Sequence, residues 1–325
     1  MDTWYQNGTW NELGWWKSAN ALETVIDYSF VRSLYNIDTI IREVYANGKY
    51  QMSGNFIGYY YDDEAWWALA WLKAYEKTSS VEYLSIAKDI FTDMLTGWDD
   101  SCGGGIYWSK GKVEKNAIEN ELFITLGARL YLNTHNDFYL FWTKKAWAWF
   151  DKTGMQGANG LINDGIDPAT CESNGKPAWT YNQGVILGGL TDLYKITGDL
   201  TFLDKARQIA TSAMTLLVDE QGVLTEPCES FADGCGTDGP QFKGIFVRYL
   251  SYLYQNELQF SQSAAQDQSF LKLCESFLAR QATSIWNNDR NAENKLGLHW
   301  RGPYIDASAS TQSSALDALV AAVSL

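Results

Sequence analysis

Helical segments of two kinds alternate along the chain, and this alternation limits the fold more than any other feature. In segments 81–95 and 201–217, apolar residues recur at helical spacing on one side and polar residues fill the other. Segments 64–75, 116–131 and 182–194 are apolar on nearly every side, so they have no face for water. We call the helices of the first kind wet-sided and those of the second kind dry. Their alternation at a period of roughly 50 to 70 residues is typical of helical hairpins arranged in concentric rings.

A weak internal repeat marks three of the turns from a dry helix to a wet-sided one. Thr78, Thr134 and Thr197 are each followed five and six residues later by an aromatic residue and a leucine. These turns are short and polar, which predicts that all of them lie at one end of the ring. The residues expected to cap the following helices are Ser80, Asp137 and Asp199.

The connections in the opposite direction are long and rich in Gly, Asn, Cys and aromatic residues. They are expected at 48–62, 96–115, 152–180, 218–240 and 284–311. Each leads into the N-terminus of a dry helix, and long loops over a rigid scaffold are where sites are usually built. The first dry helix is predicted near Trp15–Tyr28 and the last near Gln312–Val323, which gives about eleven helices. Because no linker interrupts the pattern, we expect one all-α domain over residues 1–325.

Composition excludes some partners and favours others. A formal net charge of -14 argues against nucleic acid and against an anionic membrane, since both require a basic face. No run of about 18 apolar residues predicts a transmembrane helix. The chain holds 15 Trp and 19 Tyr, and planar rings with a polar edge suit stacking against sugars. We therefore expect an oligosaccharide or polysaccharide as the partner of a monomeric protein.

The cysteine and histidine content argues against a metal centre. Five cysteines leave at least one unpaired within the chain. Cys228 and Cys235 are close enough to close a loop with a disulfide, and Cys102 or Cys171 could also pair. With two histidines in the chain, a zinc site built from His is not expected. We predict that no metal and no other cofactor is required.

Adjacent carboxylates, Asp62 and Asp63, stand at the predicted start of the dry helix 64–75. A helix N-terminus stabilises an ionised carboxylate by roughly 0.3 to 1 kcal/mol. Mutual repulsion should raise one pKa and leave the other low, which is the division of roles in a glycosidase. The simpler alternative is a helix cap at Asp62 with an acid in the first turn at Asp63. The aromatic surroundings favour the catalytic interpretation: Tyr59, Tyr60, Tyr61, Trp66 and Trp67.

A second acidic pair, Asp99 and Asp100, precedes a run of glycines and is better explained by a turn. Glycines 103 to 105 could still let the backbone approach a ligand closely. Tyr107 and Trp108 would then be possible stacking platforms.

Several motifs together resemble glycoside hydrolase family 76, the endo-α-1,6-mannanases and their fungal cell-wall relatives. The motifs span most of the chain in the order of the family: "WWKSAN" at 15–20, "YYDDEAWWALAW" at 60–71, "WDDSCGGGIYW" at 98–108, "KNAIENELFITLGARLY" at 115–131 and "WTYNQGVILGGLTDLYKITGD" at 179–199. The resemblance implies an (α/α)6 toroid of inner and outer helices with the active site at the long-loop face. It also implies retaining hydrolysis of α-1,6-mannosidic bonds in a mannan.

The resemblance also suggests roles for individual residues. Matching the adjacent aspartates of the family makes Asp62 the nucleophile and Asp63 the general acid/base. The other candidates would contact the sugar: Asn20, Tyr61, Trp66, Trp108, Asn116, Asn120, Tyr181, Asn182 and Lys243. Arg248, on the same segment as Lys243, could line the same pocket, although packing of its stem at the edge of the core explains it equally well.

Other functions remain open from the sequence. A transglycosylase would use the same aspartates with a sugar hydroxyl in place of water. A carbohydrate epimerase or isomerase would use histidine; His135 lies in a short turn at the opposite end, whereas His299 lies in a long loop. A glycan-binding protein would not need both aspartates. Without a recognisable signal peptide, the location is cytoplasmic for the chain as it stands and secreted for one trimmed at its N-terminus.

Overall fold

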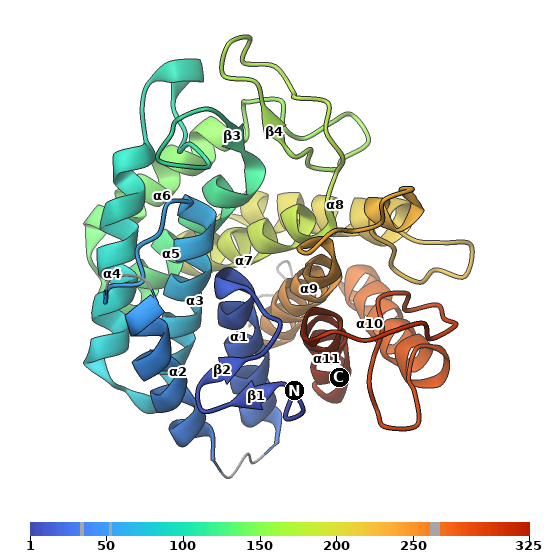
Figure 1. The fold of residues 1–325 in the computed structure, drawn as a ribbon. Helices are drawn as coiled ribbons and strands as arrows, with labels where there is room; N and C mark the ends of the chain where they lie inside the picture. Colours follow the sequence, from blue (N-terminus) through green and yellow to red (C-terminus); the bar gives the residue numbers. More distant parts are fainter. Residues whose placement is uncertain (33–35, 52–53, 261–266) are drawn as a thin grey trace. The chain divides into compact units, whose positions relative to one another are not determined.

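The computed structural model describes residues 1–32, 36–51, 54–260 and 267–325, and Figure 1 shows its course. Within these ranges the chain forms eleven α-helices and four strands of two residues each, so the all-α prediction is confirmed. The described residues separate into two compact units. Unit 1 comprises Met1–Gly157 with Ile162–Pro177, and unit 2 comprises Ala158–Leu161 with Ala178–Leu325. That they form one domain stays a prediction.

In unit 1 dry and wet-sided helices alternate as predicted. The dry ones are α1 (Trp15–Val31), α3 (Tyr61–Thr78) and α5 (Ala117–Thr134); the wet-sided ones are α2 (Ile37–Gln51), α4 (Val81–Met94) and α6 (Asp137–Phe150). Helix α3 packs against both α1 and α5. Its apolar stretch from Ala65 to Leu72 is buried without interruption, because neighbours cover every side of the helix.

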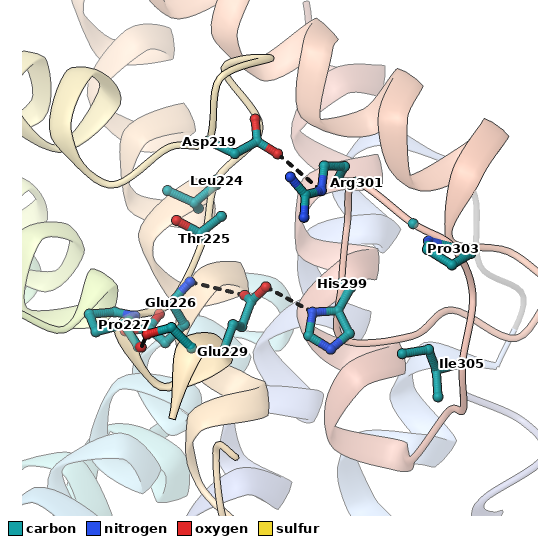
Figure 2. A pocket seen from close by; sticks show the side chains of 12 residues that line it. Asp219, Leu224, Thr225, Glu226, Pro227, Glu229, His299, Arg301, Pro303 and Ile305 are labelled. Atoms are coloured by element: carbon teal, nitrogen blue, oxygen red, sulfur yellow. Dashed lines mark hydrogen bonds and ion pairs between the residues drawn. The ribbon is translucent and has the colours of Figure 1, made fainter. Parts of the chain in front are cut away.

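Unit 2 continues the alternation. The dry helices are α7 (Thr180–Thr197), α9 (Phe242–Gln259) and α11 (Ala309–Val323), and the wet-sided ones are α8 (Leu200–Leu216) and α10 (Gln268–Asn288). Helix α9 packs against α7 and α11. Helix α11 begins earlier than predicted because Ser308 and Thr311 form a capping box. A pocket opens between the loops at 217–241 and 289–308 of this unit (Figure 2).

Short strands and 3₁₀ turns fill the connections between helices. Strands β1 (Tyr5–Gln6) and β2 (Thr9–Trp10) form one antiparallel pair, and β3 (Lys115–Asn116) and β4 (Gly165–Ile166) form another. The 3₁₀ turns are η1 (Leu95–Gly97), η2 (Ser101–Gly103), η3 (Pro227–Ser230) and η4 (Gly239–Gln241). Long connections lead into the dry helices as predicted, but the first and the last begin later than expected, because α2 continues to Gln51 and α10 to Asn288. Residues 52 and 53 of the first connection lie outside the described residues.

The repeated threonine has a physical role in each short turn. Its hydroxyl donates to the carbonyl four residues earlier and accepts the backbone N–H two residues later. The residue after it adopts a left-handed conformation that ends the helix. Ser80 and Asp199 occupy the N-cap positions as predicted. The prediction of Asp137 as a cap was wrong, because Asn136 is the N-cap and accepts from Phe138 N.

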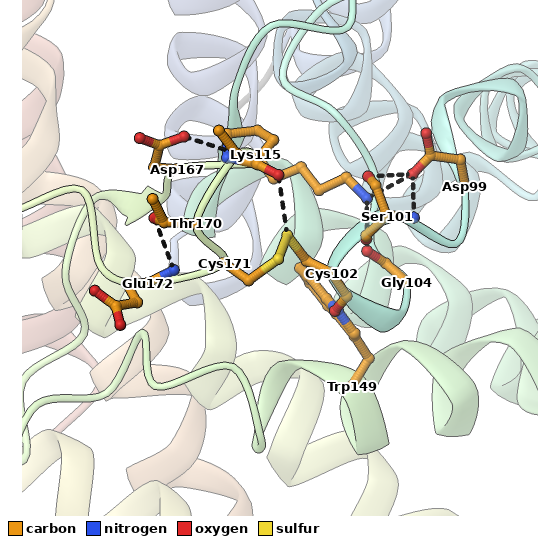
Figure 3. The surroundings of a disulfide bond; sticks show 12 residues. Asp99, Ser101, Cys102, Gly104, Lys115, Trp149, Asp167, Thr170, Cys171 and Glu172 are labelled. Atoms are coloured by element: carbon orange, nitrogen blue, oxygen red, sulfur yellow. Dashed lines mark hydrogen bonds and ion pairs between the residues drawn. A yellow bond between two sulfur atoms is a disulfide. The ribbon is translucent and has the colours of Figure 1, made fainter.

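Two disulfides fix the long loops. Cys228 and Cys235 pair as predicted, and Cys102 pairs with Cys171, which ties the loop at 95–116 to the loop that carries β4. Cys274 is the unpaired thiol and is buried. Beside the disulfide between Cys102 and Cys171, the buried Lys115 Nζ donates to Asp99 Oδ1 at 2.7 Å and to two backbone carbonyls of the loop at 95–116 (Figure 3).

The glycine run at 103–105 packs against a tryptophan of α6 instead of leaving the backbone open to a ligand. Trp149 donates its indole N–H to the carbonyl of Cys102 at 2.9 Å. A Cβ on Gly105 would lie 2.3 Å from Trp149 Cη2, and Gly105 has a φ of +89°. The run therefore serves packing. Tyr107 is also buried against this loop and is not a free platform.

Replacing Gly105 should destabilise unit 1 through a clash and not merely through backbone strain. Gly105→Ala is expected to cost about 1–3 kcal/mol more free energy of unfolding than a matched glycine without a neighbour. Gly154 is that control, because its φ is +73° and an added Cβ meets no atom within 4 Å. Urea titration followed by circular dichroism measures both variants. Equal losses for the two would contradict the packing role of the run.

Candidate active site

The two adjacent aspartates lie in the first turn of α3. The N-cap position is Tyr60, so Asp62 and Asp63 follow as the second and third helical residues. The simpler interpretation of Asp62 as a cap is therefore wrong. Both side chains are half-buried. Backbone N–H groups at this end favour a negative charge on either carboxylate.

Trp108 holds Asp62 with a directed hydrogen bond. Its indole Nε1 donates to Asp62 Oδ2 at 2.9 Å. The backbone of Trp108 is fixed as well, because its carbonyl accepts from Tyr61 N and its N–H donates to Glu114 O. The contact orients one carboxylate of the pair.

An exposed aromatic surface adjoins this carboxylate. The rings of Tyr60 and Trp108 lie 4.5 Å apart, and those of Tyr59 and Tyr60 lie 5.1 Å apart. Tyr59 is 57% exposed and Tyr60 is 36% exposed. We call these three residues the aromatic platform. Exposed rings beside a half-buried carboxylate suit the apolar face of a sugar.

A third carboxyl, Glu119, is close enough to Asp62 to interact with its charge. It lies in the first turn of α5 with no exposed surface, and its Oε1 accepts from Asn116 N at 2.5 Å and from Asn120 Nδ2 at 3.1 Å. Burial, reinforced by the negative charge of Asp62, raises the pKa of Glu119 well above its usual value. Both effects favour the protonated form of Glu119.

Glu64 is a second buried acid beside the aspartate pair. Its Oε2 accepts from Gly58 N at 3.0 Å and lies 3.8 Å from Lys110 Nζ. Lys110 forms its closer ion pair, 2.7 Å, with Asp93. Burial is the main reason that the pKa of Glu64 rises to about 9, and the charge of Asp93 adds to the shift.

Sequence reasoning missed both buried acids. The spacing of Asn116 and Glu119, a capping box across the start of α5, could have identified Glu119 as a residue at a helix N-terminus. Glu64 offered no signal, because its depth depends on the loop that covers the start of α3.

Some predicted sugar contacts prove to be scaffold. Asn120 is fully enclosed, and its amide bonds to both the N–H and the carbonyl of Ile106. Tyr61 is 2% exposed and shares a hydrogen bond with Thr96 Oγ1 at 2.8 Å. Trp66 is 1% exposed and stacks on Trp16 with ring centroids 5.9 Å apart. Their predicted contact with sugar is not supported, because no surface remains for it.

Asn20 and Asn116 are also buried in unit 1. Asn20 Nδ2 donates to Trp16 O at 3.4 Å. Asn116 begins α5 and donates to Glu114 Oε2 at 3.4 Å. Trp108 is thus a candidate whose hydrogen bond places it directly on Asp62.

The remaining candidates belong to unit 2 and are described there. Tyr181 stacks on Phe242 with ring centroids 4.0 Å apart, and Asn182 is buried at the start of α7. Lys243 is 1% exposed, and its Nζ donates to Glu229 Oε1 and, at 2.7 Å, to Leu298 O. Whether these three residues bind the substrate stays a prediction.

The comparisons with known proteins agree with each other. The sequence model of the family described as "Glycosyl hydrolase family 76" matches residues 2–324. A putative mannan endo-1,6-alpha-mannosidase of Schizosaccharomyces pombe is 28% identical over 260 residues, covering 74% of this chain and 59% of the relative. A mannan endo-1,6-alpha-mannosidase of Saccharomyces cerevisiae is 27% identical, covering 74% and 58%. The chain thus spans about three fifths of the length of these relatives.

Solved structures extend the likeness to the fold. The alpha-1,6-mannanase of Salegentibacter sp. HEL1_6 has a TM-score of 0.87 at 26% identity, covering 98% of this chain and 94% of that one. An inactive variant of it, with two consecutive aspartates replaced, was solved in complex with alpha-1,6-mannotetrose; its TM-score is 0.86 at 25% identity, with the same coverage. The predicted fold class, an α/α toroid, is confirmed by this likeness.

No helix in the described ranges is long and apolar enough to cross a membrane. The same residues contain no group of three or more His, Cys, Asp or Glu side chains that could hold a metal ion. That the protein needs no metal, and that it is monomeric, stay predictions.

The raised pKa of Glu64 predicts a specific dependence of stability on pH. The folded state keeps a proton that the unfolded chain releases near pH 4.5, so the stabilisation is complete below that pH and is lost as the pH rises through about 9. In the wild type, the free energy of unfolding should fall by up to about 1.4 kcal/mol per pH unit in this interval because of Glu64. Glu64→Gln should remove this dependence, because glutamine does not titrate. Denaturant titrations at several pH values in this interval measure it.

Glu76→Gln is the control, because Glu76 is exposed on the same helix. Its pH profile should follow that of the wild type. A profile of Glu64→Gln that matches both the wild type and this control would contradict the proton on Glu64.

Proposed function

The chain belongs to glycosyl hydrolase family 76, and from this premise we propose that it hydrolyses α-1,6-mannosidic bonds within a mannan backbone with retention of configuration. The observation that carries the proposal is the aspartate pair at the start of α3, with Asp62 held by Trp108 beside the aromatic platform. An aspartate pair is also what was replaced in the inactive relative solved with alpha-1,6-mannotetrose. The names of the relatives favour hydrolysis over transfer to a sugar acceptor.

In the proposed mechanism Asp62 is the nucleophile. A carboxylate oxygen of Asp62 attacks the anomeric carbon, and the bond from this carbon to the glycosidic oxygen breaks. The indole N–H of Trp108 donates to Oδ2 of this carboxylate and orients it.

Asp63 acts as the general acid and then as the general base. Its proton passes to the glycosidic oxygen as the leaving sugar departs. In the second step Asp63 takes a proton from water, the water oxygen bonds to the anomeric carbon, and the ester to Asp62 breaks. Two inversions return the sugar to the α configuration.

Asp62→Asn and Asp63→Asn should each lower the rate of cleavage of linear α-1,6-mannan by at least about a thousandfold. The wild type should release oligosaccharides whose first-formed reducing ends are α by proton NMR. Asp100→Asn is the matched control, because Asp100 is an exposed member of the second acidic pair and its loss should leave the rate unchanged. First products in the β configuration would overturn the retaining mechanism, and an active pair of Asn variants would overturn the assignment of residues.

Trp108→Phe should separate the hydrogen bond to Asp62 from the stacking ring. Losing a hydrogen bond to a charged group costs about 1.5–3 kcal/mol, so kcat should fall by about 10- to 100-fold while KM changes little. Trp286→Phe is the control: that tryptophan is 48% exposed on α10, and its replacement should alter neither constant. A rise in KM with an unchanged kcat would mean that Trp108 acts by stacking alone.

A further inference from the structure

The loops of unit 2 enclose a cavity of about 510 Å³ that none of the roles above uses. It lies between the loop at 217–241 and the loop at 289–308 (Figure 2). The volume is within the range of roughly 300–1,000 Å³ that is usual for small-molecule sites. Its walls combine carboxylates, one histidine, one arginine and a few apolar side chains.

The floor of the cavity is a rigid polar cluster. Glu229 Oε1 accepts from the buried Lys243 Nζ and, at 2.9 Å, from Glu226 N. Glu229 Oε2 lies 3.1 Å from His299 Nδ1. When Nδ1 donates to this carboxylate, the neutral imidazole keeps Nε2 as an acceptor for another group. The orientation of His299 is therefore fixed by protein contacts that do not require a ligand.

Asp219 supplies a buried acceptor at the rim. Its side chain is 6% exposed. Oδ1 accepts from Gln221 N and Val223 N at 2.8 and 3.0 Å. Oδ2 accepts no hydrogen bond from any described residue and lies 3.6 Å from Arg301 Nε, on the side facing the cavity (Figure 2). Arg301 compensates the charge of Asp219, and a hydroxyl donor from a ligand would supply the hydrogen bond that Oδ2 lacks.

The charges around the cavity are balanced in pairs. Arg301 lies between Asp219 and Glu220, and Lys243 neutralises Glu229. Burial raises the pKa of Glu226, which favours its neutral form. An anion would meet the carboxylates of Asp219 and Glu229, and a cation would find them already paired. The chemistry favours a neutral ligand with several hydroxyl groups.

The lining also includes apolar side chains on both loops. Pro227 lies beside Glu226 on one side, and Pro303 and Ile305 lie on the side of His299 and Arg301 (Figure 2); Ile305 is 70% exposed. A hexose presents hydroxyls at its edge and C–H groups on its face, and the cavity offers polar and apolar groups to match.

We propose that this cavity is a second sugar-binding site, in which Asp219, His299 and Arg301 bind the hydroxyls of one neutral hexose unit and Ile305 contacts its C–H face. The choice of mannose as that hexose rests on the proposed function. The site would bind and hold the glycan without taking part in bond cleavage.

The δ1-methyl carbon of Ile305 is a local probe for this site. In protein labelled with ¹³C at the isoleucine methyl groups, its NMR signal, assigned through Ile305→Val, should shift saturably when methyl α-mannoside is added. Asp219→Asn should raise the dissociation constant at least tenfold. Glu220→Gln is the matched control, since Glu220 contacts Arg301 but does not line the cavity, and it should change the constant by less than twofold.

The outcomes separate this proposal from the proposed function. An Ile305 signal that stays still with methyl mannoside, glucoside and galactoside would overturn the second site, even if the enzyme cleaves mannan. A saturable shift that Asp219→Asn weakens would support the site, even if mannan is not cleaved. A stronger response to inorganic phosphate or to methylamine than to any hexoside would overturn the assignment of a neutral ligand. Equal affinity of Asp219→Asn and Glu220→Gln for the hexoside would overturn the role of Asp219 in the site.

Discussion

Burial of the inner helices on all sides is the constraint from which the site follows. A helix such as α3 or α5 is buried on nearly every side, and the acidic side chains at its N-terminal end are stabilised by backbone N–H groups and a covering loop. Carboxyl groups in this setting differ in burial. Burial raises the pKa of the fully enclosed Glu64 and Glu119, whereas Asp62 and Asp63 are half-buried and Asp62 lies against Trp108 of the aromatic platform. Burial thus separates these enclosed acids from the proposed catalytic pair.

A buried lysine anchors a covering loop in each unit. In unit 1 the ammonium group of Lys115 donates to Asp99 and to two loop carbonyls. In unit 2 the ammonium group of Lys243 donates to Glu229 and to the carbonyl of Leu298. A buried lysine satisfied in this way fixes a long irregular loop that has few backbone pairs of its own. Each loop then positions a side chain with a polar ring, Trp108 or His299, against a carboxylate.

The order of dry and wet-sided helices could be predicted from the sequence, because the burial of a helix determines which positions in each turn are apolar. The position of Asp62 and Asp63 at the start of a dry helix followed from that order. The partners of these residues could not be predicted, because they depend on how the loop at 95–116 folds back over α3. Trp108 was expected to stack on a sugar, and the hydrogen bond from its indole N–H to Asp62 was not foreseen. Asn120 was expected to bind a sugar, and its amide instead fastens the loop at Ile106. Sequence shows which residues are present at a helix end, and the loop decides which of them remain exposed.

The central claim is that Asp62 forms the bond to the sugar. Mass spectrometry of peptides from enzyme treated with a fluorinated α-mannosyl substrate, whose glycosyl-enzyme hydrolyses slowly, tests it most directly. The account predicts one mannosyl unit attached to Asp62, on the peptide that begins α3. Attachment to another carboxylate, such as Asp63 or Glu119, or turnover of the substrate without any covalent adduct, would contradict it.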